Sequence, residues 1–309
     1  LNIIMKIYIN NPKENWVVDR FVEEWISYNR HLHTDKIKEA DLIWIISPWT
    51  WKKLPKKILQ QKKVICTIHH IDESKFDNNE EKDFLKRDKV VDIYHCISHK
   101  TEKQVKRMTR KKTFNLPFWA NQNIFFNITN KENLRDKYKI SKNDFLVGSF
   151  QRDTEGKDLV SPKLSKGPDQ FVQIAKKIQK KHNNVAVLLT GRRRQYIINE
   201  LKEAGIKYYY FEMVRFDELN EMYNMLNLYV VSSRVEGGPQ AILECGLSQT
   251  PIISTDVGIA SQILSKESIY EFETYSNPIP NIDTAYKNSK KYIIPNWFEE
   301  YHKLFNETL

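Results

Sequence analysis

Short apolar runs alternate with amphipathic stretches along the first half of the chain. The runs that predict buried strands cover residues 5–10, 40–47, 64–68 and 90–98. Between the first two, the segment from Trp16 to Tyr28 places Val17, Phe21 and Trp25 at the spacing of one helix face. Because strands that alternate with helices form parallel sheets covered on both faces, this half predicts an α/β domain.

The second half repeats the pattern. Apolar runs at residues 145–150, 185–191, 208–211, 228–232 and 251–255 predict strands, and amphipathic segments between them predict helices. This organisation predicts a second doubly wound, Rossmann-like domain with a parallel sheet. We expect the first domain to cover residues 1–126 and the second residues 127–280, followed by C-terminal helices over residues 281–309.

Composition narrows the class of protein. The chain has 309 residues, with 40% hydrophobic and 12% aromatic positions, which excludes a disordered chain. No window approaches the ~18 consecutive apolar residues of a membrane span. Three widely separated cysteines, Cys66, Cys96 and Cys245, predict neither a disulfide framework nor a metal site. We therefore expect a cytoplasmic protein.

The chain is basic, with 49 Lys and Arg against 39 Asp and Glu, which favours anionic partners. Part of the excess is concentrated in Lys100–Lys112, where seven basic residues accompany one acid, Glu102. One interpretation is peripheral contact with an anionic membrane surface. The other is an ordinary solvated helix face. The sequence contains no nucleic-acid-binding motif, so we do not expect nucleic acid as a partner.

Candidate ligand contacts follow the predicted strands of the first half. Residues 11–16 occupy the loop after the first strand, at the edge where open α/β sheets bind ligands. Asn15, Trp16 and Asp19 are therefore candidate substrate contacts, although Asp19 as a helix cap and Trp16 as a core residue fit equally well. His69 and His70 end the third run; strand alternation points the two imidazoles to opposite sides, and the sequence does not say which faces the ligand.

The most informative stretch is residues 234–244. A buried run leads into Glu236, then a turn, then residues that predict a helix. Because the N-terminus of a helix carries unpaired N–H groups and partial positive charge, such a turn is suited to bind an anion. Glu244 places a second carboxylate in the helix. The residues of the turn are Gly237, Gly238, Pro239 and Gln240.

Suppose that the ligand is a nucleotide-diphosphate sugar. Its binding site would then need cations or N–H groups around the phosphates, because negative charge develops on the diphosphate as it leaves the sugar. Arg152 and Lys166 follow the first strand of the second domain and could supply that charge, with Lys157 and Lys163 as rivals for the lysine. Gly167 would allow a close approach of the backbone. Carboxylates such as Glu236 and Glu244 accept hydrogen bonds from a pair of neighbouring hydroxyls, as on ribose or on a sugar.

At these residues the sequence resembles the retaining glycosyltransferases of family 4, which have the two-domain GT-B fold. The hallmark of that family is E-x7-E, formed here by Glu236 and Glu244. Further similarities are Lys166 with Gly167, Gly191, and the segment 251–258. The similarity is strong over residues 145–260 and weak over the first 120. Two departures are the loop 11–16, where the family has glycines, and an insertion between Arg152 and Lys166.

The resemblance implies a nucleotide-sugar donor on the C-terminal domain, an acceptor on the N-terminal domain, no essential metal or other cofactor, and a last helix that crosses back to the N-terminal domain. It implies that Glu236 contacts the transferred sugar, Glu244 the ribose, and Arg152 with Lys166 the diphosphate, while His69 or His70 acts from the first domain. The remaining donor contacts that it implies are Gly167, Gly191, Glu212, Met213, Val214, Gly237, Gly238, Pro239 and Gln240.

The leading hypothesis is a retaining, metal-independent hexosyltransferase that builds a cell-surface polysaccharide or glycolipid. One alternative is an epimerase or hydrolase of the same fold that acts on sugar nucleotides. Another is a non-catalytic module that binds sugars or membranes. The nucleotide base, the sugar, the acceptor with its linkage and the oligomeric state are left open by the sequence.

Overall fold

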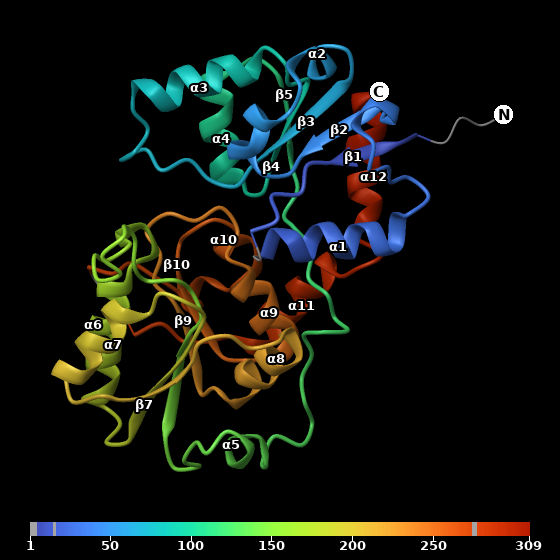
Figure 1. Cartoon of the computed structure of the whole chain (residues 1–309). Coiled ribbons are helices and arrows are strands. Elements are labelled where there is room, and N and C mark those ends of the chain that lie inside the picture. Colours follow the sequence, from blue (N-terminus) through green and yellow to red (C-terminus); the bar gives the residue numbers. More distant parts are fainter. Residues whose placement is uncertain (1–4, 15–16, 274–276) are drawn as a thin grey trace. The chain divides into compact units, whose positions relative to one another are not determined.

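The computed structural model describes residues 5–14, 17–273 and 277–309 (Figure 1). The chain forms two compact units, Leu1–Trp119 with Ile294–Leu309, and Ala120–Ile293. The first unit thus ends before the expected junction at 126, and the segment 281–309 divides between the units. At the start of the second unit, Ala120 N donates a hydrogen bond to Tyr292 O over 2.9 Å.

The first unit contains a five-stranded sheet in the order β1-β2-β3-β4-β5, with every neighbouring pair parallel. Apolar residues fill β2, β3 and β4 because both faces of these strands are covered by helices. The bounds of the strands are β1 Ile7–Ile9, β2 Leu42–Ile45, β3 Lys63–Ile68, β4 Ile93–Cys96 and β5 Lys112–Asn115.

The strand β1 has a neighbour on each side. Ile7 forms a parallel bridge with His33, supported by hydrogen bonds from Ile7 N to Leu32 O (2.7 Å) and from Thr34 N to Ile7 O (3.0 Å). β2 pairs with the opposite side of β1. After β1 the chain therefore passes first to one side of this strand, at His33, and then to its other side, at β2. Such a reversal is a topological switch point, and ligands of open α/β sheets bind at its carboxyl edge.

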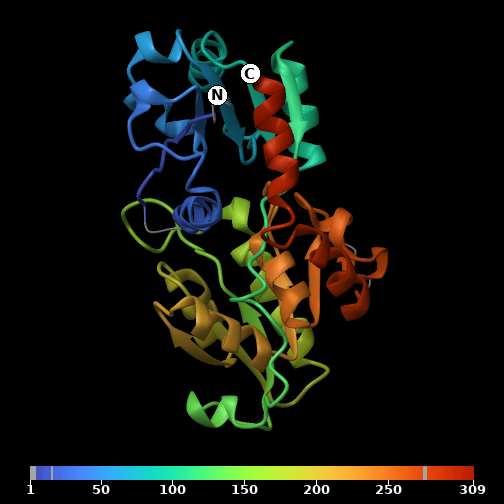
Figure 2. The ribbon, with the colours of Figure 1, turned by 90° about the vertical axis from the view of Figure 1, so that its right-hand side faces the viewer.

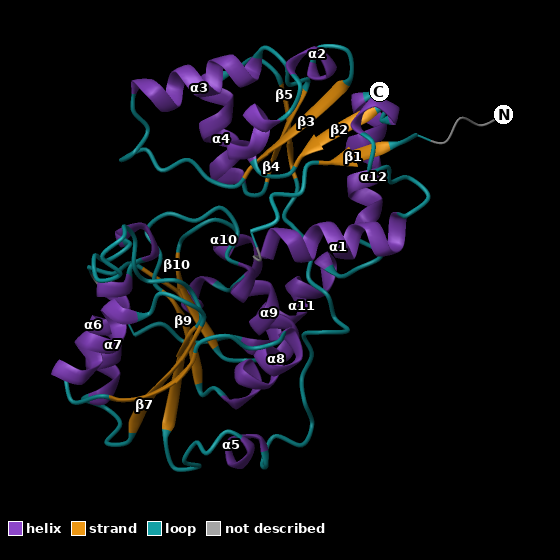
Figure 3. Cartoon of the chain, viewed as in Figure 1, coloured by secondary structure: helices purple, strands orange, loops and turns teal. Residues whose placement is uncertain are grey.

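Helices cover both faces of this sheet, as Figure 3 shows. Residues of α1 and α12 join one core cluster with the sheet, and residues of α2, α3 and α4 join the cluster on the other face. Figure 2 shows α12, in red, beside the strands of this unit. The bounds are α1 Val17–Asn29, η1 Ile37–Glu39, η2 Pro48–Lys53, α2 Lys56–Leu59, α3 Asn78–Asp88, α4 His99–Met108 and α12 Phe298–Thr308.

The second unit contains a six-stranded parallel sheet in the order β11-β10-β9-β6-β7-β8. From β6 the chain proceeds to β7 and β8 on one side, then returns to β9 on the other side of β6. The switch point of this sheet therefore lies between β6 and β9. The bounds are β6 Phe145–Ser149, β7 Val185–Thr190, β8 Lys207–Phe211, β9 Leu228–Val231, β10 Ile252–Thr255 and β11 Ile269–Tyr270.

The helices of the second unit also form two layers. Residues of α6 and α7 pack on one face, and residues of α8, α9, α10 and α11 pack on the other. The bounds are α5 Leu134–Lys137, η3 Leu164–Lys166, α6 Pro168–Gln179, α7 Gln195–Glu203, α8 Phe216–Met225, α9 Gln240–Ser248, α10 Ala260–Ile263, η4 Lys266–Ser268, α11 Ile282–Ser289 and η5 Lys290–Tyr292.

Gly167 lies at the switch point of the second sheet, where the segment before α6 contacts the end of β9. It immediately precedes α6, has a φ of +61°, and lies so close to the end of β9 that a Cβ atom would stand 1.8 Å from the carbonyl oxygen of Ser232. A side chain at this position would suffer both the strain of left-handed backbone and a clash with main-chain atoms. Only glycine lets these two segments approach so closely.

Replacement of Gly167 by alanine tests this close approach. We expect Gly167→Ala to lower stability by clearly more than the roughly 1–2 kcal/mol that left-handed backbone costs, measured as a lower Tm by calorimetry. Gly205→Ala is the matched control, because Gly205 has a φ of +64° but nothing lies within 4 Å of the added Cβ. Equal losses in the two variants would show that the contact with Ser232 contributes nothing.

Candidate active site

The candidate donor residues collect at the carboxyl edge of the second sheet. Because all six strands are parallel, the residues that follow them lie along the same edge. Arg152 follows β6, Glu236 follows β9, and Gly258 follows β10. Gly191 and Glu212 follow β7 and β8, farther along the edge. The residues that the sequence analysis singled out are thus brought to one side of the unit by its topology.

At the centre of this edge Lys166 and Glu236 form an ion pair between Nζ and Oε1. The two side chains are largely buried, with exposed fractions of 21% and 12%. The backbone holds them in place, since the N–H groups of Arg234 and Val235 donate to the carbonyl oxygen of Ser165 over 2.9 Å and 3.0 Å. Sequence analysis selected both residues but did not predict that they form a pair.

Three residues that sequence analysis did not select hold the segment between β6 and α6 against the loop after β9. The amide Nε2 of Gln151 donates to the carbonyl oxygen of Lys166 (2.9 Å), and its Oε1 accepts from Ser233 Oγ after β9 (3.3 Å). Arg234 donates to both carboxylate oxygens of Asp169 (2.7 Å and 2.6 Å), a bidentate pair of the strong kind. The signal available in the sequence was the position of each residue, directly after a predicted strand or in the first turn of a predicted helix.

The basic residues of the insertion do not all belong to the site. Burial and the neighbouring cations Arg152 and Lys166 lower the pKa of Lys163 to about 8. Burial, together with the charge of Arg193, also lowers the pKa of Arg152. Lys157 is exposed on the outer part of the insertion. Lys163 thus stands with Arg152 and Lys166 as a third cation near Glu236, whereas Lys157 does not.

The insertion is a small hairpin anchored to the sheet. Lys163 N donates to the carbonyl oxygen of Asp153 (2.8 Å), and Thr154 bridges Pro162. Below the hairpin, Arg194 is completely buried and donates to the carboxylate of Asp153 over 3.1 Å. Removal of one partner of such a pair would leave a buried charge uncompensated. The base of the hairpin is therefore fixed, and Lys163 is fixed with it.

Glu244 lies deeper than Glu236. It is 4% exposed within α9 and accepts a hydrogen bond of 2.8 Å from the hydroxyl of Tyr223. Burial and the charge of Glu244 raise the pKa of Tyr223 well above its usual value, so that hydroxyl remains a donor. A carboxylate can accept further hydrogen bonds beside this one.

The glycine turn is supported from behind by the loop after β10. A Cβ atom on Gly258 would lie 2.3 Å from the carbonyl oxygen of Gly237, so the two backbones are in direct contact. Gly238 and Pro239 then lead into α9, which begins at Gln240. Among the described residues, the buried Oε1 of Gln240 has no hydrogen-bond partner, which leaves a polar atom available at the start of the helix.

The remaining predicted donor contacts lie at the β7–β8 side of the edge. The carbonyl oxygen of Gly191 accepts from the hydroxyl of Tyr210 over 3.0 Å. Glu212 and Met213 are exposed, and Val214 is half-buried. Glu212 is paired loosely with Arg192, at 4.0 Å. These positions form an open surface rather than a packed one.

In the first unit the structure distinguishes the two histidines. His69 is half-buried and donates from Nε2 to the carbonyl oxygen of Ile46 over 2.8 Å, whereas His70 is exposed. Asp19 lies in the first turn of α1 and accepts a hydrogen bond from Lys13 N over 3.0 Å, which ties the loop after β1 to the helix. Asn15 and Trp16 lie outside the described residues.

Two further features bear on other kinds of site. Across the described ranges, no group of three His, Cys, Asp or Glu side chains is placed to hold a metal ion. No helix in the same ranges is long and apolar enough to cross a membrane.

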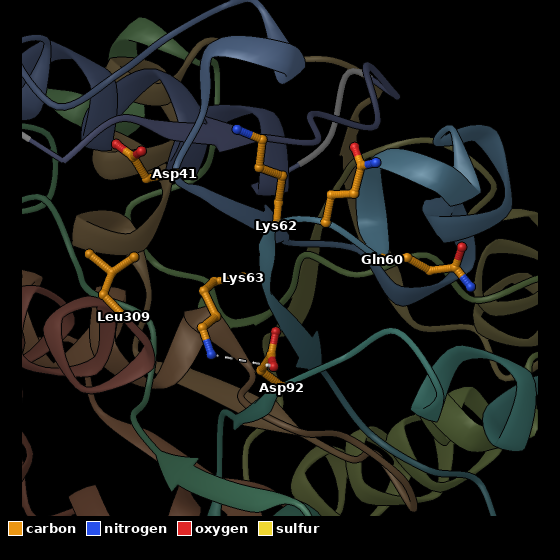
Figure 4. Close-up of a pocket in the computed structure, with 7 residues that line it drawn as sticks. Asp41, Gln60, Lys62, Lys63, Asp92 and Leu309 are labelled. Carbon is orange, nitrogen blue, oxygen red and sulfur yellow. Dashed lines mark ion pairs between the residues drawn. The ribbon is translucent and has the colours of Figure 1, made fainter.

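The pocket in Figure 4 is lined by Asp41, Lys63, Asp92 and neighbouring residues at the starts of β2, β3 and β4, at the edge of the sheet opposite the histidines.

Solved structures with the same fold span nearly the whole chain. A structure of HepE from Anabaena in complex with UDP has a TM-score of 0.73 and 12% identity, covering 98% of this chain and 100% of that one. A glycosyltransferase from Rickettsia africae gives 0.67 and 13%, covering 100% and 99%. Sucrose-phosphate synthase from Thermosynechococcus elongatus gives 0.67 and 14%, covering 93% and 77%. The expected GT-B fold is confirmed.

Sequence comparison identifies the family. No curated protein matches the chain. The pattern of the family described as glycosyl transferases group 1 matches residues 130–292, more than half of the chain, and contains the Lys166–Glu236 pair, Glu244 and the glycine turn. The chain belongs to the glycosyl transferases group 1 family, family 4 of the glycosyltransferases, and is an enzyme that uses a nucleotide-sugar donor.

Proposed function

We propose that this enzyme transfers a sugar, with retention of the anomeric configuration and without an essential metal, from a nucleotide-diphosphate sugar to a cell-surface glycan or glycolipid. The observation that carries the proposal is the Lys166–Glu236 pair at the switch point of the second sheet. There a cation for phosphate and a carboxylate for sugar hydroxyls stand side by side, with Arg152 and Lys163 adding positive charge.

Each group has a distinct part in the proposed reaction. Departure of the nucleoside diphosphate increases the negative charge on its phosphates, and preorganised cations stabilise that charge. Arg152 and Lys166 take this part. Glu236 holds hydroxyls of the transferred sugar, and Glu244 holds the ribose. The acceptor attacks on the face that the diphosphate leaves, and the diphosphate takes the acceptor's proton.

Two features of the site support this division. First, Lys166 and Glu236 neutralise each other, so neither charge has to be buried alone before the donor arrives. Second, the start of α9 presents backbone N–H groups and the unpartnered Gln240 amide oxygen, as seen among the described residues, beside the glycine turn. Gly237 to Gln240 thus supply neutral contacts, while the charged contacts come from the other loop.

A thermal-shift panel of UDP, GDP, ADP and their sugars tests the donor site. Since a ligand at 100 times its Kd stabilises the folded state by about 2.7 kcal/mol, one of these compounds should raise Tm by roughly 5 °C. Glu236→Gln should keep the shift given by the free nucleotide and lose the additional shift given by the sugar. Glu203→Gln, an exposed glutamate of α7, is the control.

The same compounds, used both as ligands and as substrates, separate the competing functions. If no compound shifts Tm, the donor site is wrongly assigned. If the unmodified protein, incubated with donor alone, releases free sugar or an epimerised sugar nucleotide as its main product, it is a hydrolase or epimerase. A transfer product whose anomeric configuration is opposite to that of the donor would contradict retention.

Lys163 gives the donor site a pH dependence with a defined sign. Its folded-state pKa, about 8, lies below the ordinary 10.5, so the charged ammonium destabilises the folded protein below pH 8. This destabilisation disappears as the pH rises from about 8 to about 10.5. Bound phosphate would favour the ammonium, so donor binding should take up protons above pH 8.

Lys163→Met should therefore raise Tm at pH 7 and weaken binding of the nucleotide about tenfold, since a hydrogen bond to a charged group contributes roughly 1.5–3 kcal/mol. Calorimetry in buffers of different ionisation enthalpy should show proton uptake at pH 8.5 that the variant lacks. Lys157→Met, on the exposed part of the same hairpin, is the control. A lower Tm with unchanged nucleotide binding would show that Lys163 is structural.

The basic segment Lys100–Lys112 supports a second proposal, contact with an anionic membrane. In α4, Thr101 and Val105 face the core, while the basic side chains of the segment are exposed. Ion pairs already offset part of their charge: Lys106 with Glu102 at 2.9 Å, and Arg107 with Glu73 at 3.6 Å. Lys112 is paired with Glu307, and Lys100 also has an interaction of its own, so the net attraction depends mainly on Lys103, Arg110 and Lys111.

Changing these three residues to glutamine should weaken binding to phosphatidylserine vesicles about a hundredfold, because each contributes roughly 1 kcal/mol near the surface. Cosedimentation at low salt measures the effect. The control changes three exposed lysines of the second unit, Lys177, Lys180 and Lys181, and so removes equal charge. Equal binding by the two triple variants would contradict a specific role for the segment.

A further inference from the structure

The first unit has a ligand edge of its own, at the switch point between β1 and β2 (Figure 1). Three hydrogen bonds fix the loop after β1 there, one to the strand β2 and two to the turn η2 that follows it. Asn10 N donates to Trp44 O (2.9 Å) and Asn10 Nδ2 to Thr50 Oγ1 (2.7 Å), both within the core. The third, at the surface, runs from Trp49 Nε1 to Glu14 Oε1 over 2.9 Å.

Trp49 differs from the other tryptophans of the described ranges. Trp25, Trp44 and Trp119 are completely buried, and two more are partly buried, whereas Trp49 is 52% exposed. A large aromatic surface left in water at a ligand edge is a candidate binding surface, although a single exposed apolar residue is common elsewhere on proteins. The packing of other rings beneath the indole decides whether Trp49 is a binding surface or an ordinary exposed residue.

The indole of Trp49 rests on a column of rings that runs into the core. The ring of His69 lies 5.7 Å from it, and Phe118 lies 5.6 Å beyond His69. Phe118 is buried and stacks on Phe21 at 4.3 Å. His69 is itself fixed by its hydrogen bond to the carbonyl oxygen of Ile46. The exposed indole is thus held in one orientation before any ligand arrives, which lowers the entropy cost of binding.

We propose that Trp49 and Glu14 form a binding subsite for a sugar residue of the acceptor, with the sugar's C–H face on the indole and its hydroxyls on the carboxylate. This inference rests on the proposed function, since a transferase needs an acceptor. The chemistry matches a sugar ring, which has an apolar face and a rim of hydroxyl donors. A carboxylate has several acceptor positions, so Glu14 can hold the indole N–H and a hydroxyl together.

A lipid chain fits this surface less well. Glu14 carries a carboxylate, and burying that group beneath hydrocarbon would carry the cost of removing it from water. Lys13, His70 and Lys52 are also exposed around this edge. The polar surroundings favour a hydrated ligand with many hydroxyls. His69 belongs to the subsite as a positioning residue, since its ring orients the indole.

Saturation-transfer NMR with methyl glucoside, cellobiose and chitobiose tests the subsite, because it reports which ligand protons lie against the protein. We expect saturation of ring C–H protons by the unmodified protein and a loss of at least fivefold in Trp49→Ala. Trp49→Phe keeps an aromatic ring but loses the N–H, so it should retain part of the signal. Glu14→Gln should weaken the signal without abolishing it.

The matched control is Trp51→Phe. Trp51 lies in the same turn, but its Nε1 donates to Asp83 on α3, over 3.2 Å, and it is only partly exposed. The variant should keep the full signal. Tm and the thermal shift given by UDP are measured on every variant, because an intact shift shows that the donor site and the fold survive.

The outcomes separate this inference from the proposed function. Loss of the sugar signal with an intact nucleotide shift supports the subsite. An unchanged signal in Trp49→Ala, or no signal from the unmodified protein with any of the three sugars, overturns it and leaves the donor site standing. If Trp49→Ala instead loses the nucleotide shift, the indole stacks on a base and the subsite is wrong. Reduced binding to phosphatidylserine vesicles in place of the sugar effect would also overturn it.

Discussion

The parallel alignment of the strands is the constraint on which both candidate sites depend. In the second sheet the strand order reverses beside β6, and in the first the bridge between Ile7 and His33 lies on the side of β1 opposite β2. Each arrangement brings two loops to the same edge with no strand between them. The two loops of the second unit meet through Lys166 and Glu236, and those of the first through Glu14 and Trp49. Their chemistry differs, charged in one case and aromatic in the other, but their origin in the topology is the same.

The proposed donor edge of the second sheet gathers more positive charge than folding alone would favour. Burial and the cations Arg152 and Lys166 disfavour the ammonium of Lys163, while burial and the charge of Arg193 lower the pKa of Arg152. A site that is unfavourable when empty gains affinity for a polyanion, because the ligand relieves the repulsion. The buried Arg194–Asp153 pair and the contact of Gly167 with Ser232 hold the loops in place against that repulsion.

Much of this architecture could be predicted from the sequence. Apolar runs identified the main strands, and the residues from Glu236 to Glu244 identified the family. Other features depend on contacts across the fold, which no local pattern encodes. The hairpin that delivers Lys163, the Arg234–Asp169 pair and the choice between His69 and His70 are of this kind. The helix α3 has so few apolar residues that its periodicity is weak.

The last helix has a consequence for how the protein is made. Phe298, Tyr301 and Phe305 of α12 are buried in the core of the first unit, against Trp25 and Trp44. A ribosome synthesises these residues only after the whole of the second unit. During translation the first unit therefore waits with one face of its sheet covered only in part, by α1 without α12, while the second unit already has its full sequence. The interval between the two events is when the nascent chain would most need a chaperone.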